Sequence, residues 1–324
     1  MDSISEKISR WIPSKYDDQE NRNSLLYLYN ISLGVDFLPL FRQFNHRVRK
    51  IKYNFTSSSI ASGAMCFFGS LLMSFCRIGY VKNIEELFTF AACYILTDHY
   101  IDDNNISNEN KSRTIQQIDN FINQIKPGVE DNIKIESPII RSVADNYIRM
   151  INKIPKSEYH LKKMFRVEVE TMYLQNRSDL SREKYLEISE WKGGLFSNAI
   201  HSILQLNITS AEYDLGSAIQ LMDDILDIED DINLGINTIA TYDYKTYGNL
   251  DKLLIYVINK VDNLHKIYTL FKPVLYLGLA WAVHNNKNMY TSEMVKIMDH
   301  YIYYQENTTK KNMILWLENL ISDS

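Results

Sequence analysis

The stretch LGSAIQLMDDILDIEDDIN, residues 215–233, begins without charge and ends in a dense group of acids. Its apolar positions repeat at the spacing of one helical stripe: Leu221, Ile225, Ile228 and Ile232. Asp223, Asp227 and Asp231 are spaced four residues apart, so they lie along a different face of the same helix. We call these three residues the acidic ladder. The pattern predicts a buried helix with a row of carboxylates along one side.

A second group of acids follows another apolar run. The run LFTFAACYIL occupies residues 87–96, and Asp98, Asp102 and Asp103 come directly after it. Asp98 and Asp102 are four residues apart, so their Cβ atoms lie about 6 Å from each other on one helix face. Carboxylates that close repel, and the pKa of one of them rises unless a cation lies between them. Mg²⁺ suits such a site, because it binds through carboxylates together with phosphate oxygens.

Both groups of acids therefore end apolar helical segments, which predicts that they line the mouth of an interior cavity with metal ions between them. The alternative is a solvated acidic surface, the usual role of acids on one helix face. A calcium loop fits less well, because its ligands alternate through a loop that contains Gly. Zinc also fits poorly, since His99 is the one imidazole near the first group and no Cys/His set accompanies it.

The composition favours long helices. The chain has 324 residues, of which 45% are apolar, enough for one large core or two modest ones. Its 11 Gly and 6 Pro leave long uninterrupted segments. The net charge of −5 provides no basic face, so we expect no nucleic-acid partner. Three cysteines without paired or metal-type spacing, Cys66, Cys76 and Cys93, predict small core residues in a reducing compartment.

Two segments bear on localisation. Residues 1–19 lack the apolar stretch of a secretory signal. Residues 56–76 carry no charge and are long enough to cross a bilayer, but Ser, Thr and Gly dilute them. We expect a buried core helix there, no transmembrane span, and a cytoplasmic protein.

Helical periodicity recurs along the chain, and no segment alternates with period two for long enough to indicate a sheet. We expect helices at about 57–79, 83–103, 112–125, 136–152, 158–175, 181–206, 210–230, 247–270, 273–285, 291–305 and 309–322. Ser181 is the expected N-cap of its helix. The sequence thus predicts an all-α protein in which residues 1–20 form a mobile or capping arm and residues 21–324 form a single domain.

Over roughly residues 85–245 the sequence resembles the class I isoprenoid synthases, which include prenyl diphosphate synthases, squalene/phytoene synthases and terpene cyclases. DDILD at 223–227 matches the second aspartate-rich DDxxD motif of that superfamily, and DHYID at 98–102 resembles the first motif in a degenerate form. The acidic ladder also fits the three positions of the terpene-cyclase metal-binding triad. The resemblance implies an antiparallel helical bundle with a central active-site cavity. It also implies several Mg²⁺ ions held by the outer positions of the first motif, Asp98 and Asp102, and by the ladder.

The segment between the motifs carries further similarity. In LQNRSDLSREKYLEISEWKGGLF, residues 174–196, Lys192 falls at the diphosphate-binding lysine, and Gly193 and Gly194 fall where the superfamily breaks this helix. Arg177 has the spacing of the cyclases' diphosphate-sensing arginine. Aromatic residues that flank the motifs would face the substrate and its cation: Phe88, Phe90, Tyr94 and Phe196. Ordinary core packing is the alternative for each of these aromatic residues.

The resemblance implies a terpene synthase, a carbon–oxygen lyase that ionises one prenyl diphosphate to an allylic cation and releases diphosphate after cyclisation or elimination. The segments that hold isopentenyl diphosphate in chain-elongating enzymes are missing, which favours the cyclase. The cyclases' C-terminal Arg-Tyr pair is also missing, since HYIYYQ at 300–305 has no Arg. A prenyltransferase that elongates or condenses prenyl chains is the alternative, and a non-catalytic partner subunit is a further one. A homodimer is the common state of such enzymes.

Overall fold

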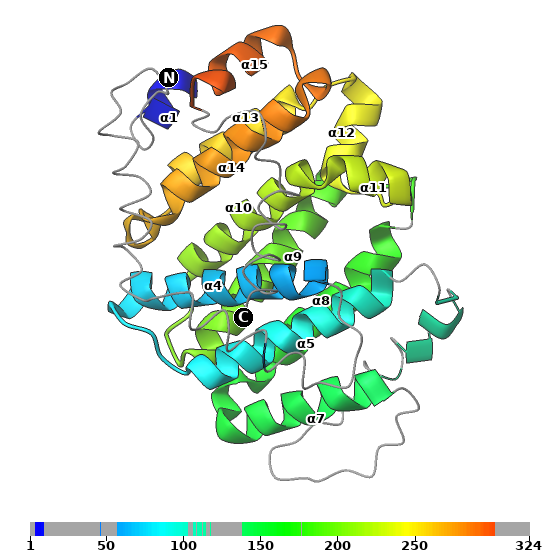
Figure 1. The fold of residues 1–324 in the computed structure, drawn as a ribbon, viewed down its shortest axis with the longest axis vertical. Coiled ribbons are helices and arrows are strands. Elements are labelled where there is room, and N and C mark those ends of the chain that lie inside the picture. Colours follow the sequence, from blue (N-terminus) through cyan, green and yellow to red (C-terminus); the bar gives the residue numbers. More distant parts are fainter. Residues whose placement is uncertain are drawn as a thin grey trace. The chain divides into compact units, whose positions relative to one another are not determined.

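The computed structural model describes residues 4–9, 46, 57–102, 106–107, 109–111, 113–114, 117, 138–175 and 177–301. These residues form helices joined by turns, and they include no strand, which confirms the all-α prediction for the described ranges (Figure 1). The expected helices at 112–125 and 309–322 lie largely or wholly outside them. In the ranges that the structure describes, no helix is long and apolar enough to cross a membrane.

The chain divides into two compact units. The first contains the described residues of Met1–Val35, Glu170–Asn198 and Ile208–Thr309. The second contains those of Asp36–Val169, Ala199–Asn207 and Lys310–Ser324. The expected single domain over residues 21–324 stays a prediction.

The second unit is a stack of helices. Helix α5 (Ile84–Asp102) packs on one side against α4 (Ser57–Ile78) and on the other against α7 (Pro138–Lys153). A short 3₁₀ turn, η1 (Pro155–Ser157), leads from α7 into α8 (Glu158–Gln175), whose last residues belong to the first unit. Among the core residues of α4 and α5 are the following: Phe67, Leu71, Met73, Leu87 and Phe90. The expected buried helix at 57–79 is therefore confirmed.

In the first unit, α10 (Ser210–Leu226) packs against α13 (Asp251–Asp262) and α14 (Phe271–Asn285). Its side chains Leu215, Leu221 and Ile225 are completely buried. Helix α14 is apolar on several faces because it also contacts α13 and α15 (Ser292–Met298); Figure 1 shows α13 and α14 side by side. Three short 3₁₀ turns complete this part of the chain: η2 (Lys266–Tyr268), η3 (Lys287–Met289) and η4 (Asp299–Tyr301).

Helix α1 (Ile4–Ser9) also belongs to the first unit and contacts α13. The Lys7 ammonium donates to the Asn259 side chain at 2.6 Å and lies 3.7 Å from the Asp262 carboxylate. The described part of residues 1–20 is therefore a short helix held against α13, and the mobile or capping arm stays a prediction.

One predicted helix is shorter than expected, and a helix that precedes it was missed. The expected helix at 247–270 begins at Asp251, because Gly248 takes a left-handed conformation (φ 72°) that closes the preceding helix. It ends earlier than expected, at Asp262. That preceding helix, α12 (Ile239–Tyr247), was not predicted. It begins at a capping box in which the Thr238 hydroxyl accepts from the backbone N–H of Thr241, at 3.3 Å.

Helix α9 (Arg182–Ile203) begins as predicted and then runs without a break. The Ser181 hydroxyl accepts from the backbone N–H of Lys184 at 3.3 Å, which confirms the expected N-cap. Gly193 and Gly194 lie inside the continuous helix, so the break found here in the resembling enzymes is absent. These glycines serve a close contact instead: a Cβ on Gly193 would lie far inside 3.0 Å of the Gly216 carbonyl oxygen on α10.

The α9–α10 crossing is antiparallel. A Cβ on Gly193 would also meet Gln220, and one on Gly216 would meet Ser197. Residues later in α9 thus meet residues earlier in α10. The two backbones touch at this crossing, and larger side chains there would force the helices apart.

We predict that Gly216→Ala lowers the free energy of unfolding by about 2 kcal/mol, because the added methyl group meets the rigid backbone of Gly193. Denaturant unfolding followed by circular dichroism measures the change. Gly69→Ala in α4 is the matched control, since no heavy atom outside the helix backbone lies within 4 Å of its added Cβ in the described structure. This control should gain about 0.5–1 kcal/mol from helix propensity. An equal response of the two variants would contradict the crossing.

Candidate active site

The acidic ladder lies where α10 meets α11 (Ile228–Leu234). Asp227 joins the two helices with φ −95° and ψ 7°, so the helix is locally bent rather than regular as predicted. The hydrogen bonds between residues four apart nevertheless continue through the bend. The Asp227 N–H donates to the Asp223 carbonyl, and the Asp231 N–H donates to the Asp227 carbonyl, each at 2.9 Å. The four-residue spacing of the ladder is therefore retained in the backbone.

The ladder residues differ in their exposure to solvent. Asp223 is exposed, whereas Asp227 and Asp231 are half-buried. The Asp231 carboxylate accepts a hydrogen bond from the Thr238 hydroxyl at 3.2 Å, and Thr238 is the residue that caps α12. The start of α12 thus fixes the end of the ladder, a contact that the sequence reasoning missed.

Asp224, which follows Asp223 in the sequence, is buried on a face of α10 about 100° from that of Asp223. Its Oδ2 accepts from the Ser189 hydroxyl of α9 at 2.5 Å, and its Oδ1 accepts from the Gln220 amide at 3.0 Å. Burial raises the pKa of the Asp224 carboxyl, while these two hydrogen bonds and the nearby Lys192 ammonium act in the opposite direction. Asp224 is therefore a buried polar anchor between α9 and α10.

The Asp231 carboxyl has a strongly raised pKa. Burial is the main cause that raises its pKa, and the charges of Asp224, Asp227 and Asp223 act in the same direction. The hydrogen bond from Thr238 opposes them, and the net result is a pKa of about 7. The carboxylates at this end of α10 therefore repel one another when all are ionised. A bound cation would relieve this repulsion, by the same argument that the sequence analysis made for Asp98 and Asp102.

The donor set fits Mg²⁺ that is shared with a ligand. In the described ranges, no three His, Cys, Asp or Glu side chains converge closely enough to hold one metal ion by themselves. Mg²⁺ often takes one or two carboxylates and completes its shell with water and phosphate oxygens, so the ladder carboxylates suit a metal ion that binds together with a phosphate group.

Lys192 lies one turn after Ser189 on α9, so both residues project from the same face of that helix. It is half-buried, and its charge acts on Asp224. The structure therefore brings Lys192, Asp224 and the ladder into one region of the first unit. Phe196, four residues further along α9, is half-buried.

Arg177, the expected diphosphate-sensing arginine, is paired with a neighbouring carboxylate. Its guanidinium donates to both carboxylate oxygens of Asp179, at 2.9 and 2.7 Å, and both residues are exposed. The hydrogen bond raises the pKa of Arg177 and lowers that of Asp179. The sequence reasoning missed another arginine–aspartate pair: the half-buried Arg182 at the start of α9 donates to both oxygens of the buried Asp243 in α12, at 2.7 and 2.8 Å.

The first acidic group belongs to the second unit. Asp98 and Asp102 lie in the last turns of α5, but their side chains are outside the described structure, as is Asp103 altogether. Tyr94, one turn before Asp98, is half-buried. The roles of these residues stay predictions.

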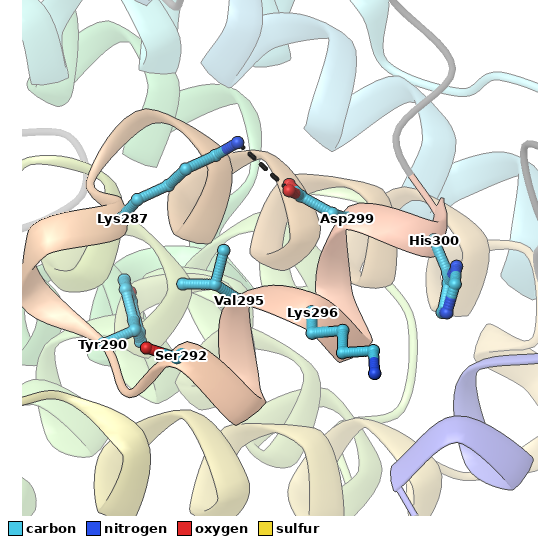
Figure 2. Close-up of a pocket in the computed structure, with 7 residues that line it drawn as sticks. All are labelled: Lys287, Tyr290, Ser292, Val295, Lys296, Asp299 and His300. Atoms are coloured by element: carbon cyan, nitrogen blue, oxygen red, sulfur yellow. Dashed lines mark hydrogen bonds and ion pairs between the residues drawn. The ribbon is translucent and has the colours of Figure 1, made fainter.

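A pocket of about 570 Å³ lies elsewhere in the first unit, around the end of α14 and α15. Figure 2 shows the ion pair between Lys287 and Asp299 at this pocket, with 3.0 Å between the charged atoms. Asp299 also bonds to the His284 ring at 3.1 Å. Burial opposes the ionisation of Asp299, but the hydrogen bonds from His284 and Lys287 outweigh it and lower its pKa. None of the predicted site residues lines this pocket.

The raised pKa of Asp231 predicts a pH dependence of stability. Because the folded-state pKa of about 7 exceeds the ordinary value of 3.8, the folded protein binds more protons than the unfolded chain between these values. This carboxyl therefore lowers the free energy of unfolding as pH rises from about 4 to about 7. Without divalent cations, we expect Asp231→Asn to gain about 2 kcal/mol relative to the unmodified protein between pH 5 and pH 8.

Denaturant unfolding at the two pH values measures this gain. Asp230→Asn is the matched control, since it removes an exposed carboxylate from the same short helix and its effect should change little with pH. A difference between Asp231→Asn and the unmodified protein that is the same at both pH values would show that Asp231 titrates as an ordinary carboxyl.

The arrangement can place a metal-bound anionic group beside the ladder, with the Lys192 ammonium on the neighbouring helix. Such a region suits the binding of a phosphate-bearing ligand, because metal ions and ammonium groups both neutralise phosphate charge.

The chain was compared with models of protein families and with curated proteins, and none of them matches the chain.

Proposed function

We propose that this protein is a magnesium-dependent enzyme of the class I isoprenoid synthase type, which ionises a prenyl diphosphate and releases diphosphate. The observation that carries the proposal is the acidic ladder, in which burial, together with repulsion from Asp224, Asp227 and Asp223, raises the pKa of Asp231 to about 7. Asp223, Asp227 and Asp231 would hold Mg²⁺, as the resemblance of DDILD to the second aspartate-rich motif implies. Asp98 and Asp102 are the proposed ligands from the first motif.

The chemistry follows from the charges. When bound, Mg²⁺ neutralises the charge that develops on the leaving diphosphate. Lys192 would add an ammonium group to the same anion. Arg177 would contribute a planar guanidinium, which pairs well with phosphate oxygens once its exposed contact with Asp179 opens or rearranges. Tyr94 and Phe196 are the proposed aromatic neighbours of the prenyl chain and its cation.

Within this type, the terpene synthase is the leading assignment. Its support comes from the sequence. The ladder residues are four residues apart, as in the cyclase triad, and the segments that bind isopentenyl diphosphate are missing. A prenyltransferase would use the same ladder and lysine. A partner subunit without catalytic activity is the third assignment. The homodimer and the cytoplasmic location stay predictions.

The proposal predicts that Asp223→Asn combined with Asp227→Asn abolishes turnover while the fold is kept. The purified full chain is incubated with Mg²⁺ and farnesyl, geranylgeranyl or longer prenyl diphosphates, and released diphosphate and extracted products are measured by a coupled assay and gas chromatography–mass spectrometry. We expect a loss of about 100-fold or more, because the metal ions that stabilise the leaving group lose their ligands. Circular dichroism checks the helical content.

Asp214→Asn is the matched control, because it removes an exposed carboxylate from α10 far from the ladder and should retain full turnover. A hydrocarbon or alcohol formed without isopentenyl diphosphate identifies the terpene synthase, whereas longer diphosphates formed with it identify the prenyltransferase. Full turnover by the double variant would remove the ladder from the active site, and an unmodified protein without turnover on all these substrates would favour the partner subunit.

A further inference from the structure

Two adjacent acids of the DDILD segment have opposite environments. Asp223 is exposed, whereas Asp224 is 5% exposed. Successive residues of a helix point about 100° apart, so a DD pair on a helix cannot present both carboxylates to the same ligand. The four-residue spacing of the ladder includes Asp223 and omits Asp224, and the structure shows that Asp224 is buried.

Both oxygens of Asp224 already have partners. The Ser189 hydroxyl lies 2.5 Å from Oδ2, and the Gln220 amide nitrogen lies 3.0 Å from Oδ1. These donors are neutral, and the carboxylate is buried beneath the helix surface that carries Asp223. Asp224 is therefore arranged to join α10 to α9 and to receive hydrogen bonds from protein groups.

The hydrogen bond between Ser189 and Asp224 helps to set the alignment of α9 and α10. Gly193 meets Gly216 and Gln220 at the crossing, so the α9 backbone is in contact with α10 one turn after Ser189. The bond from Ser189 to Asp224 is a second point of attachment at the other end of the same α9 turn. Lys192 lies between these two attachments. Its position relative to α10 is therefore fixed from both sides.

We propose that Asp224 is a positioning residue that, through Ser189, holds Lys192 of α9 beside the acidic ladder so that its ammonium group binds the diphosphate of the ligand. This inference rests on the proposed function for the class of ligand. It assigns metal binding to Asp223 and Asp227 and excludes Asp224 from it. The charge of Lys192 acts on Asp224, which supports their proximity.

The test is a double-mutant cycle on binding, independent of turnover. Isothermal titration calorimetry with the full chain measures the affinity for inorganic diphosphate in excess Mg²⁺, and separately for Mg²⁺ alone. We expect Lys192→Ala and Asp224→Asn each to weaken diphosphate binding about tenfold, and the double variant to be no weaker than about tenfold, because both changes remove the same interaction. A cycle in which the two effects multiply would overturn the positioning role.

Binding of Mg²⁺ alone separates a positioning residue from a ligand. Asp224→Asn should keep the Mg²⁺ affinity within about threefold of the unmodified protein, as should the control Asp214→Asn, whereas Asp223→Asn should weaken it by tenfold or more. Loss of Mg²⁺ binding in Asp224→Asn as large as in Asp223→Asn would make Asp224 a metal ligand and overturn the inference.

Ser189→Ala keeps the test decisive if Asp224→Asn does not fold. This variant removes one donor and leaves the carboxylate in place, so it should weaken diphosphate binding in the unmodified chain and have no added effect in Lys192→Ala. An added effect overturns the inference. If the unmodified protein binds Mg²⁺ but no diphosphate, the inference fails while the metal site remains, and if it binds neither, the proposed function fails with it.

Discussion

The contact between the backbones of α9 and α10 at Gly193 and Gly216 determines where the candidate active site can form. Because neither residue has a side chain, the two helices touch, and the polar residues one or two turns away come within hydrogen-bonding distance. The bond from Ser189 to Asp224 depends directly on this contact. The helix that carries the ladder and the helix that carries Lys192 are thereby held as one piece of structure.

The other feature of this region is a conflict between burial and charge. The Asp223–Asp231 segment places four carboxylates near one another, and the protein stabilises them in different ways. Asp224 is satisfied by neutral hydrogen-bond donors and by a nearby lysine, so it needs no external partner. Asp231 receives one bond from Thr238 and retains a pKa of about 7. A carboxyl with such a raised pKa, as at Asp231, is a candidate functional group, because native proteins usually satisfy or neutralise buried charges.

The sequence predicted the helical class and most of the helix positions, because apolar periodicity reports directly on which face of a helix is buried. It missed α12, a nine-residue helix that depends on the Thr238 capping box and on Gly248. It predicted a continuous helix through Gly193 and Gly194 but not the crossing that they serve, since spacing alone does not distinguish a flexible glycine from a closely packed one. It assigned no role to Asp224, because Ser189, the partner that donates a hydrogen bond to it, is 35 residues away in the sequence. Such pairings are tertiary and cannot be read from local pattern.

The central claim is that the acidic ladder needs a cation. Carboxyl ¹³C NMR of the Asp231 side chain, titrated with and without Mg²⁺ and inorganic diphosphate, tests it most directly. The account predicts a midpoint near pH 7 in the absence of Mg²⁺ and a clear shift to lower pH when both are present, since a bound cation stabilises the ionised carboxylate. A midpoint close to about 4 that is unchanged by Mg²⁺ and diphosphate would contradict the account.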